Sequence, residues 1–408
     1  MTTLLTETAI PSPVSIGGLE KQLSILPKEV TFCQRCVVSN QRPRILFDDE
    51  GICSACRFAY EKYHLINWKE REEQLVQLLD QHRRKDGSWD IIVPCSGGKD
   101  SSYVAHQLKT RYDMHPLTVT WAPFRYTETG YRNFLNFVDA GFNNFMAYPN
   151  GQFHRKLTRL AFEELGDAWQ PFAYGQLCFA FHVSLRFNID LIFFGENGEA
   201  EYGGDPKNNY RPYMPLEDWA TLYFKGTTVD ELVQFGLRHK SYFTGNDFNP
   251  PDLQFYRPPP IEKLIATGIQ MHWYSYYHKW VPQENYYYSV DSTSFSANPE
   301  RSEGTYSKYA SLDDRMDGFH FYMAFIKFGI GRATSDAGHE IRDGHITREE
   351  GVALVRRYDG EFPSRYFPEF LEYLDIDEEH FWRVVDHYRQ PHIWAKVNGT
   401  WKLRHQVS

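Results

Sequence analysis

The sequence predicts an α/β fold in which a doubly wound parallel sheet is joined to a cysteine-rich N-terminal module and a mostly helical C-terminal region. Between residues 89 and 194, short apolar stretches alternate with helical patterns, and a glycine-containing turn follows the first stretch. Two CxxC pairs precede this part, and an aromatic-rich part follows from about residue 206. Strands separated by helices of this length form parallel sheets covered on both faces.

The first predicted strand ends in the turn that is most informative about chemistry. Ile91, Ile92 and Val93 form a buried strand, the run SGGKDSS occupies 96–102, and a helix continues through Leu108. Two glycines permit a tight turn that directs backbone N–H groups at an anion. The run is not a Walker A loop, because GxxxxGK[ST] would need glycine at Val93.

The remaining elements alternate in the order that such a sheet requires. We expect a capped helix from Asn67, strands at 116–121, 144–148 and 190–194, and helices at 131–140, 153–165 and 176–187. Ligands gather at the carboxyl ends of the strands in these sheets. The loop after the strand at 190–194, GENGE, is therefore a candidate ligand loop, and a solvated glycine-rich turn is the alternative.

Six cysteines divide into one cluster and two single residues. Cys33, Cys36, Cys53 and Cys56 form two CxxC pairs, whose spacing favours a structural zinc site with four thiolate ligands. Two disulfides or an iron–sulfur cluster are the alternatives. Cys95 and Cys178 stand among apolar residues, and we expect both to be buried, unreactive thiols.

Length indicates a protein with two or three structural units, and the lack of an evident membrane span or secretion signal predicts a cytoplasmic location. The chain has 408 residues and a formal net charge of −9. We predict a flexible tail at 1–30, a zinc module at 31–62, a sheet domain at 63–205 and a helical, aromatic-rich region at 206–408. The acidic balance argues against a nucleic-acid partner, and neither a membrane-inserted segment nor a secretion signal is evident.

The C-terminal region carries one polar cluster with specific spacing. If 334–342 is helical, Asp336, His339, Glu340 and Asp343 share one face. Lys327 and Arg332 lie beside glycines in the same segment, where they could meet a diphosphate or a sugar carboxylate. A solvated helix face is an equally good interpretation of each residue taken singly.

The run SGGKDSS resembles the SGGxDS loop of the PP-loop ATP pyrophosphatases. That resemblance implies that ATP is cleaved between its α- and β-phosphates, with Asp100 helping to hold Mg²⁺. It also implies that Thr120 and Trp121 border the adenine and that the GENGE loop faces the nucleotide. The implied ATP-binding residues are Ser96, Gly97, Gly98, Lys99, Asp100, Ser101, Ser102, Thr120, Trp121, Gly195, Glu196 and Asn197.

Several longer motifs resemble the N-acetyl sugar amidotransferases, a family of bacterial surface-polysaccharide enzymes of the WbpG type. They include CQRCVVSNQRP, GICSAC, QLCFAFHVSLRFNIDLIFFGENGE, EGTYSKYASLDDRMDGFHFY and FGIGRATSDAGHEIRDGHITREEG, and together they span about 33–407. The resemblance implies ATP-dependent conversion of an acetamido group on a nucleotide-linked sugar, expected to be UDP-linked, to an acetamidino group. It further implies roles in lipopolysaccharide O-antigen biosynthesis, with ATP, Mg²⁺ and Zn²⁺ as cofactors.

Residue roles in that reaction follow from the motifs and from residue chemistry. We expect Lys99, Asp100, Asp336 and His339 to act in catalysis and Lys327, Arg332 and His339 to bind the sugar nucleotide. No cysteine has the context of a glutaminase nucleophile, so a separate glutaminase subunit is expected to supply ammonia. The family's use of such partners adds a cyclase-like subunit to this expectation.

Two other functional classes stay open at the level of sequence. A PP-loop tRNA thiolase also combines SGGxDS with zinc knuckles, but it would need a sulfur carrier, and Cys178 stands where a cysteine pair would be required. A nucleotide sensor would bind ATP without releasing pyrophosphate.

Overall fold

A five-stranded parallel sheet forms the centre of the computed structural model, which describes residues 16–215, 224–239 and 242–408. The strands are β1 (Ile91–Pro94), β2 (Pro116–Trp121), β3 (Asn143–Ala147), β4 (Leu191–Phe194) and β5 (Gln270–Trp273). They lie in the order β3-β2-β1-β4-β5, and every neighbouring pair is parallel. The doubly wound α/β class predicted from the sequence is therefore correct for the sheet.

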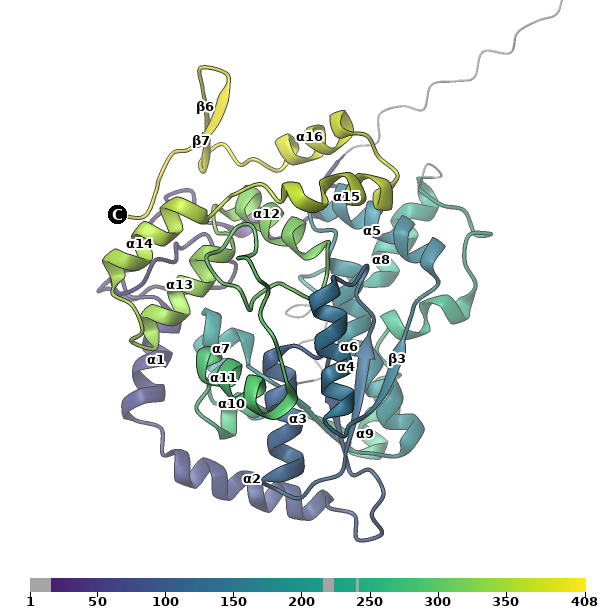
Figure 1. Ribbon diagram of the computed structural model, residues 1–408. Helices are drawn as coiled ribbons and strands as arrows, with labels where there is room; N and C mark the ends of the chain where they lie inside the picture. The colour runs from purple at the N-terminus through teal and green to yellow at the C-terminus, as the bar shows by residue number, and fades with distance from the viewer. Residues whose placement is uncertain (1–15, 216–223, 240–241) are drawn as a thin grey trace, which may run out of the picture.

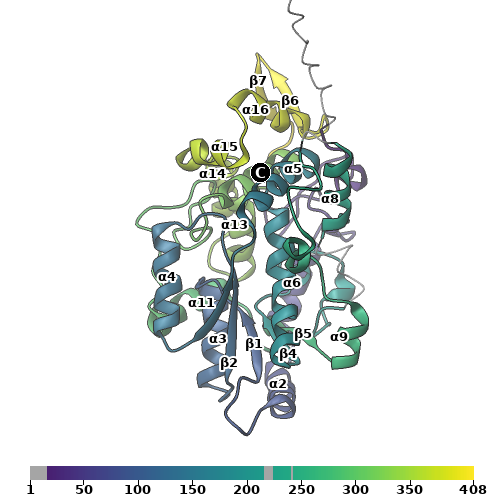
Figure 2. The same cartoon turned by 90° about the vertical axis from the view of Figure 1, so that its right-hand side faces the viewer.

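Helices cover both faces of this sheet because alternate strand residues point to opposite sides. Ile91 and Val93 face α2 (Trp68–His82) and α3 (Lys99–Thr110), whose Leu75 and Leu108 join them in one apolar core. Ile92 faces the other way, toward α5 (Gly151–Leu165) and α6 (Gln170–Phe187). In Figure 2, α3 and α6 lie on opposite sides of β1 and β2.

The other helices arrange themselves around this centre (Figure 1). They are α1 (Ser54–His64), α4 (Glu128–Asp139), α7 (Gly198–Tyr202), α8 (Val229–Arg238), α9 (Ile261–Thr267), α10 (Tyr274–Tyr277), α11 (Pro282–Thr293), α12 (Asp317–Phe328), α13 (Arg332–Arg342), α14 (Arg348–Tyr358), α15 (Phe367–Leu374) and α16 (Glu378–His387). Short 3-10 helices occupy Leu23–Ile25, Pro206–Asn208, Pro250–Tyr256 and Ser364–Tyr366.

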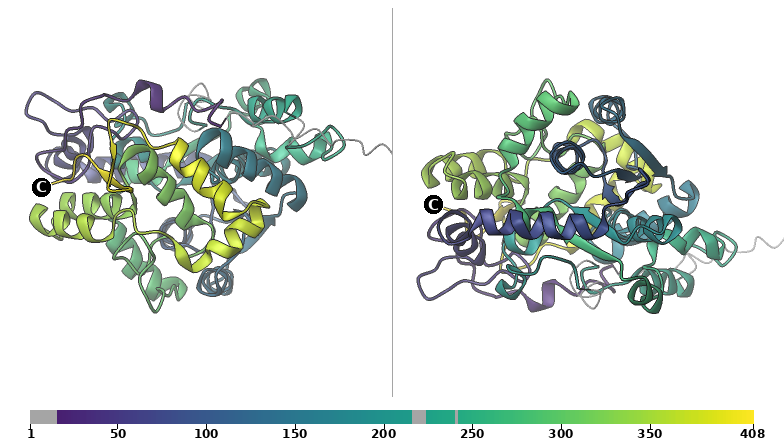
Figure 3. Two further views of the ribbon diagram at one scale, coloured as in Figure 1. Left: turned by 90° about the horizontal axis from the view of Figure 1, so that it is seen from above. Right: turned by 90° about the horizontal axis from the view of Figure 1, so that it is seen from below.

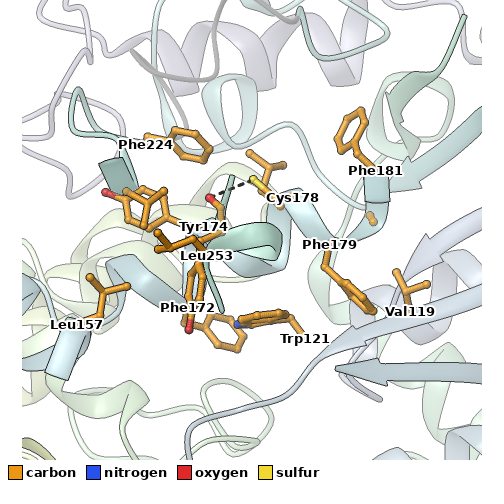
Figure 4. Close-up of a cluster of buried hydrophobic side chains, with 14 of the residues drawn as sticks. Val119, Trp121, Leu157, Phe172, Tyr174, Cys178, Phe179, Phe181, Phe224 and Leu253 are labelled. Carbon is orange, nitrogen blue, oxygen red and sulfur yellow. Dashed lines mark hydrogen bonds between the residues drawn. The ribbon is translucent and has the colours of Figure 1, made fainter. Parts of the chain in front are cut away.

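Trp121 fixes how α6 packs on the sheet. Its indole lies against Phe179, with ring centroids 6.1 Å apart (Figure 4). An added Cβ at Gly175 would come within 2.1 Å of the Trp121 ring, so only glycine permits this approach. The helix therefore passes directly over the end of β2, at the edge where we expect ligands to bind.

Local sequence signals were sufficient to predict some elements but not others. The strand predicted at 116–121 has the bounds of β2, and the Asn67 side chain caps α2 by accepting a hydrogen bond from the Glu70 amide. Helix α6 starts at Gln170, six residues before its predicted start at 176, with Pro171 in its first turn. Strand β5 lies in the region predicted to be helical, because a four-residue strand inside an aromatic run carries no distinct periodic signal.

The predicted N-terminal tail divides into two parts. Residues 1–15 lie outside the described residues. The backbone amide of Gly17 donates to the Glu163 carbonyl at 3.1 Å, and that of Gly18 donates to the Glu164 carboxylate at 2.7 Å. Leu26 is buried. Gly17 and Gly18 thus contact α5, and Lys21 pairs with Glu231 of α8, so part of the range predicted as a tail has partners on the folded body.

The C-terminal helices form a separate layer over one end of the molecule, whereas α2 crosses the opposite end (Figure 3). Phe319 and Phe370 stack at 3.9 Å in the core of this layer, and Phe162 of α5 joins them. A two-stranded antiparallel hairpin, β6 (Trp394–Val397) and β7 (Thr400–Leu403), follows α16. Among the described residues, no helix is long and apolar enough to cross a membrane.

A buried lysine joins four parts of the chain. The Lys62 ammonium, on α1, lies 3.1 Å from the Glu201 carboxylate and 3.2 Å from the Asp343 carboxylate. It also donates to the Trp280 carbonyl at 2.9 Å. Because a buried ammonium needs nearby anions, this cluster ties the cysteine module to the loop after β4 and to the end of α13.

Candidate active site

The strand order creates a crevice at the carboxyl ends of β1 and β4. From β1 the chain winds outward through β2 and β3, and it then returns to place β4 on the other side of β1. The loops after β1 and β4 consequently diverge to opposite sides. Ligands of open α/β sheets bind at such a topological switch point.

A cavity of about 470 Å³ lies at this switch point. One wall is the predicted loop after β1 and another is the loop after β4, while β2, α4, α6 and the C-terminal region supply the rest. Its lining includes Ser96, Gly97, Gly98, Lys99, Asp100, Ser101, Thr120, Trp121, Gly195, Glu196, Asp313, Asp317, Phe321 and Arg332. The structure thus brings together most of the residues that sequence reasoning assigned to ATP.

The turn after β1 requires its first glycine. Gly97 has φ of +82°, and an added Cβ would lie 2.5 Å from the Phe134 Cα on α4. Gly98 has φ of −69°, and an added Cβ would lie 3.4 Å from its nearest heavy atom, the Ser96 Oγ. The backbone therefore packs tightly against α4 at Gly97, whereas a side chain could be accommodated at Gly98.

The amino end of α3 is directed into the cavity. Gly98 is its N-cap residue, and no side chain caps the helix within the described parts of the chain. Its first-turn N–H groups can therefore bind an anion, reinforced by the positive end of the helix dipole. Ser101 lines the cavity as expected, whereas the Ser102 side chain is buried behind the loop and does not.

Lys99 and Asp100 carry opposite charges at the start of α3. Their side chains form an ion pair, and the Asn285 amide donates to the other oxygen of Asp100 at 3.0 Å. Ser289, also on α11, donates to the Lys99 carbonyl at 2.7 Å. Helix α11, from the predicted aromatic-rich region, therefore orients both residues, and no sequence pattern indicates this support.

The two candidates in the loop after β4 have different positions. Glu196 lines the cavity, where burial and the nearby Asp100 carboxylate raise the pKa of Glu196 to about 7. Asn197 instead caps α7, and its amide donates to the Asn208 carbonyl at 3.0 Å. The predicted ligand role of Asn197 is therefore not supported, because both ends of its side chain are used within the loop.

Thr120 and Trp121 both line the cavity at the end of β2. The Thr120 hydroxyl is occupied by hydrogen bonds to the Cys95 carbonyl and to Asn144. The Trp121 ring is buried against α6, so the side chains contribute mainly shape to this wall.

The charged residues of the C-terminal wall are Asp313, Asp317 and Arg332. The two aspartates were not among the predicted site residues. Burial and the nearby Asp317 raise the pKa of Asp313 to about 6, partly offset by a hydrogen bond from Ser96. The main chain at Asp313 packs closely against α4 because residue 130 is glycine: an added Cβ at Gly130 would lie 2.4 Å from the Asp313 Cα. Arg332 lies with its guanidinium 4.6 Å from the centre of the Phe321 ring.

Asp336 and His339 lie behind this wall and do not line the cavity. Asp336 accepts hydrogen bonds from Arg332 at 3.0 Å and from Thr305 at 2.6 Å, so it positions Arg332. His339 packs edge-on against Tyr202 at 4.6 Å, and neither ring nitrogen has a hydrogen-bond partner among the described residues. Burial holds the pKa of His339 well below its usual value. Direct catalytic contact by either residue is therefore not supported by this arrangement.

Lys327 is separated from the first cavity. Its ammonium donates to the Leu165 carbonyl at 2.7 Å and pairs with Glu20 at 3.0 Å. It lines instead a neighbouring cavity of about 250 Å³. The sequence placed Lys327 and Arg332 together, but α12 and α13 direct them into different cavities.

The four clustered cysteines are arranged for one metal ion. Their sulfur atoms lie within 4.8 Å of one another, with Cys33 and Cys56 at 3.8 Å and Cys36 and Cys53 at 3.7 Å. A tetrahedral zinc ion with sulfur ligands at about 2.3 Å gives sulfur separations of about 3.8 Å. These thiols therefore fit the zinc ion that their spacing predicts, and all four are buried.

The two remaining cysteines are buried, as expected. Cys178 donates to the Tyr256 carbonyl at 3.6 Å, and burial raises its pKa well above the usual value (Figure 4). Cys95 lines the first cavity, but burial raises its pKa to about 11. Neither thiol is suited to form the thiolate that sulfur transfer or glutamine hydrolysis requires.

The C-terminal part of the chain resembles a known family. Residues 303–407 match the family model described as the C-terminal domain of WbpG-like lipopolysaccharide biosynthesis proteins. This segment supplies Asp313, Asp317, Phe321 and Arg332 to the cavity. No curated protein matches the chain. One wall of the site therefore comes from a segment that is similar to lipopolysaccharide biosynthesis proteins.

Proposed function

We propose that this protein is an ATP-dependent amidotransferase that converts the acetamido group of a nucleotide-linked sugar to an acetamidino group in bacterial lipopolysaccharide biosynthesis. One observation carries the proposal. A single cavity has the SGGKDS loop on one side and the WbpG-like segment on the other. A PP-loop site for ATP would thereby face a segment that is similar to lipopolysaccharide biosynthesis proteins.

The loop after β1 is suited to hold the β- and γ-phosphates of ATP. The free amides at the start of α3 and the Lys99 ammonium offer positive charge, and Ser96 and Ser101 offer hydroxyl donors. Asp100 and Glu196 supply the oxygen ligands that Mg²⁺ prefers, and both line the cavity. The bound ion would neutralise phosphate charge as pyrophosphate departs.

The reaction we propose has two balanced steps. The acetamido oxygen attacks the α-phosphorus of ATP, an O–P bond to AMP forms, the amide nitrogen loses its proton to solvent, and the bond from the α-phosphorus to pyrophosphate breaks. Ammonia then adds to the imidate carbon and loses one proton, and breakage of the C–O bond releases AMP and leaves an amidine. Adenylation is needed because the oxygen of an amide is a poor leaving group until it is bonded to phosphorus.

The chain's contribution would be positioning, charge stabilisation and exclusion of water. Lys99 and Arg332 lie on opposing walls, where they could balance the charge of the phosphates and of AMP as it leaves. Trp121, Phe172 and Phe179 make one side of the cavity apolar. An apolar lining protects an adenylated imidate from hydrolysis.

Ammonia would come from a separate glutaminase subunit, with a cyclase-like subunit as a further partner. All six cysteines are buried, four of them cluster as metal ligands, and the pKa of each of the other two thiols is raised. Glutamine hydrolysis by this class of chemistry needs an accessible thiolate with a base beside it. The purified chain should therefore use ammonium salts but not glutamine.

The test follows phosphate products and sugar mass together. The protein is incubated with ATP, Mg²⁺, an ammonium salt and a panel of UDP-linked mono- and diacetamido sugars. We expect AMP and pyrophosphate in equal amounts, with the sugar product lighter by about 1 Da, the difference between oxygen and an NH group. Stoichiometric ADP and orthophosphate, or pyrophosphate release without an amidine, would contradict the proposal. The Asp100→Ala variant should still bind the sugar nucleotide while releasing no pyrophosphate.

A further inference from the structure

A second cavity adjoins the first and has a strongly basic lining. Its volume is about 250 Å³, and we call it the cationic cavity. Its lining includes the charged side chains of Arg42, Arg44, Asp167, Lys225 and Lys327 and the imidazole of His320. A basic cavity is unexpected in a chain whose formal net charge is −9, and it indicates affinity for an anion.

Most of these cations already have a carboxylate partner. Asp167 pairs with Lys225 and, at 2.8 Å, with His320. Arg44 pairs with Glu199 at 2.6 Å, and Lys327 pairs with Glu20. These ion pairs fix the side chains around the cavity without supplying a carboxylate to every cation.

Arg42 is the exception. Its Nε donates to the Gly203 carbonyl at 3.2 Å, and its guanidinium lies 5.4 Å from the centre of the Tyr202 ring. Among the described residues, it forms no ion pair with a carboxylate. Burial and the neighbouring Arg44 lower the pKa of Arg42 to about 10, and the Glu199 carboxylate, which pairs with Arg44, offsets only part of this effect.

The two cavities share a wall. Phe321 lines both, and Arg332 of the first cavity lies over its ring. Trp169, which lines the first cavity, lies 5.9 Å from His320 of the cationic cavity. The two cavities are therefore adjacent, with Phe321 at their boundary, next to the site that we assign to ATP.

We propose that the cationic cavity binds the diphosphate of the nucleotide-linked sugar, so that the sugar lies at the boundary formed by Phe321 and Arg332. This inference rests on the proposed function, because it places the second substrate of that reaction. The Arg42 guanidinium offers donors in a planar fork that matches phosphate oxygens. Separate anion sites keep the two sets of phosphates apart, with ATP on the α3 side.

The cysteine module would then have a direct part in substrate binding. Arg42 and Arg44 lie between the two CxxC pairs, and Ile45, the next residue, is buried among the cysteines. The Arg42 amide donates to the Ser39 carbonyl at 3.3 Å, which fixes the turn that carries the arginines. A zinc ion on the four thiols would hold this turn in place and, through it, the phosphate donors.

Isothermal titration of the full chain tests the inference without depending on turnover. The probes are UDP-N-acetylglucosamine, UDP and uridine in one series, and ATP with Mg²⁺ in another. We expect Arg42→Gln and Lys225→Gln each to raise the Kd of UDP-N-acetylglucosamine and of UDP by about tenfold or more. The Kd of ATP should change less than twofold, and uridine, which lacks phosphate, should bind much more weakly than UDP.

Arg84→Gln is the matched control. Arg84 is a half-buried arginine that also donates to a main-chain carbonyl, that of Asn188, and it lines neither cavity. This variant should bind all probes like the wild type. The inference is overturned if UDP fails to bind the wild type, if both cavity variants bind UDP normally, or if ATP is weakened equally. Failure of the proposed function is seen separately, as absence of an amidine product while UDP still binds at this cavity.

Discussion

Replacing Gly97 by alanine should destabilise the protein much more than the same replacement at Gly98. Left-handed backbone costs a non-glycine residue about 1–2 kcal/mol, and Gly97 has φ of +82°. The new Cβ would also overlap the Phe134 main chain, at 2.5 Å from Cα and 2.7 Å from N. Relieving such an overlap by backbone shifts costs about 1–3 kcal/mol more. We therefore expect a loss of about 2–5 kcal/mol in the free energy of unfolding.

Gly98→Ala provides the comparison within the same loop. Its φ of −69° suits alanine, and the nearest heavy atom to the added Cβ is 3.4 Å away. Loss of glycine flexibility in the unfolded chain would even stabilise this variant by up to about 1 kcal/mol. Urea unfolding followed by circular dichroism measures both variants. Equal midpoints would refute the reasoning, and so would a Gly98 variant that is the less stable of the two.

Three further predictions address the site, pH and metal. Arg332→Gln should raise the KM for the sugar nucleotide by about tenfold, the loss of one charge-assisted contact, whereas Arg84→Gln should leave it unchanged; an unaltered KM for Arg332→Gln would remove that residue from the site. Burial lowers the pKa of His154 from about 6.5 to about 3, so the folded protein binds this proton less well than the unfolded chain and loses stability as pH falls. The wild type should therefore lose about 3 kcal/mol more than His154→Gln between pH 7 and pH 4, measured by urea unfolding, and parallel pH profiles would show that His154 is not responsible. Cys36→Ser should abolish stoichiometric zinc, measured by mass spectrometry of the metal, and lower the unfolding temperature; retention of one zinc ion per chain would exclude Cys36 as a ligand.

Local sequence signals were sufficient for the first strands and for the loop after β1. The β-branched run Ile91–Val93, the glycines at 97 and 98 and the following helix agree with one another, so no distant contact was needed to predict them. The same holds for the four cysteines, whose spacing predicts the cluster that the fold assembles. At these positions, the residue types and their spacing along the chain are enough to predict the local structure.

Other parts of the site depend on contacts between residues that lie far apart in the chain, and sequence spacing does not predict such contacts. Asp313 reaches the cavity because Gly130 of α4 lets the backbone approach, and Asn285 reaches Asp100 from a helix 185 residues later. Asp336 and His339 share a helix face as predicted, but the partners across that face decide their roles. Asp336 supports Arg332, and His339 packs on Tyr202.

The Lys62 cluster bears on whether the segment that matches the family model can exist alone. Residues 303–407 contribute Asp343 to this ammonium, and two arginines of the segment, Arg342 and Arg348, donate to the Glu201 and Cys33 carbonyls. In the excised segment, Asp343, Arg342 and Arg348 would all lose these partners. We therefore expect the isolated fragment to be protease-sensitive, and the intact chain to melt in one cooperative transition that includes its cysteine-rich end.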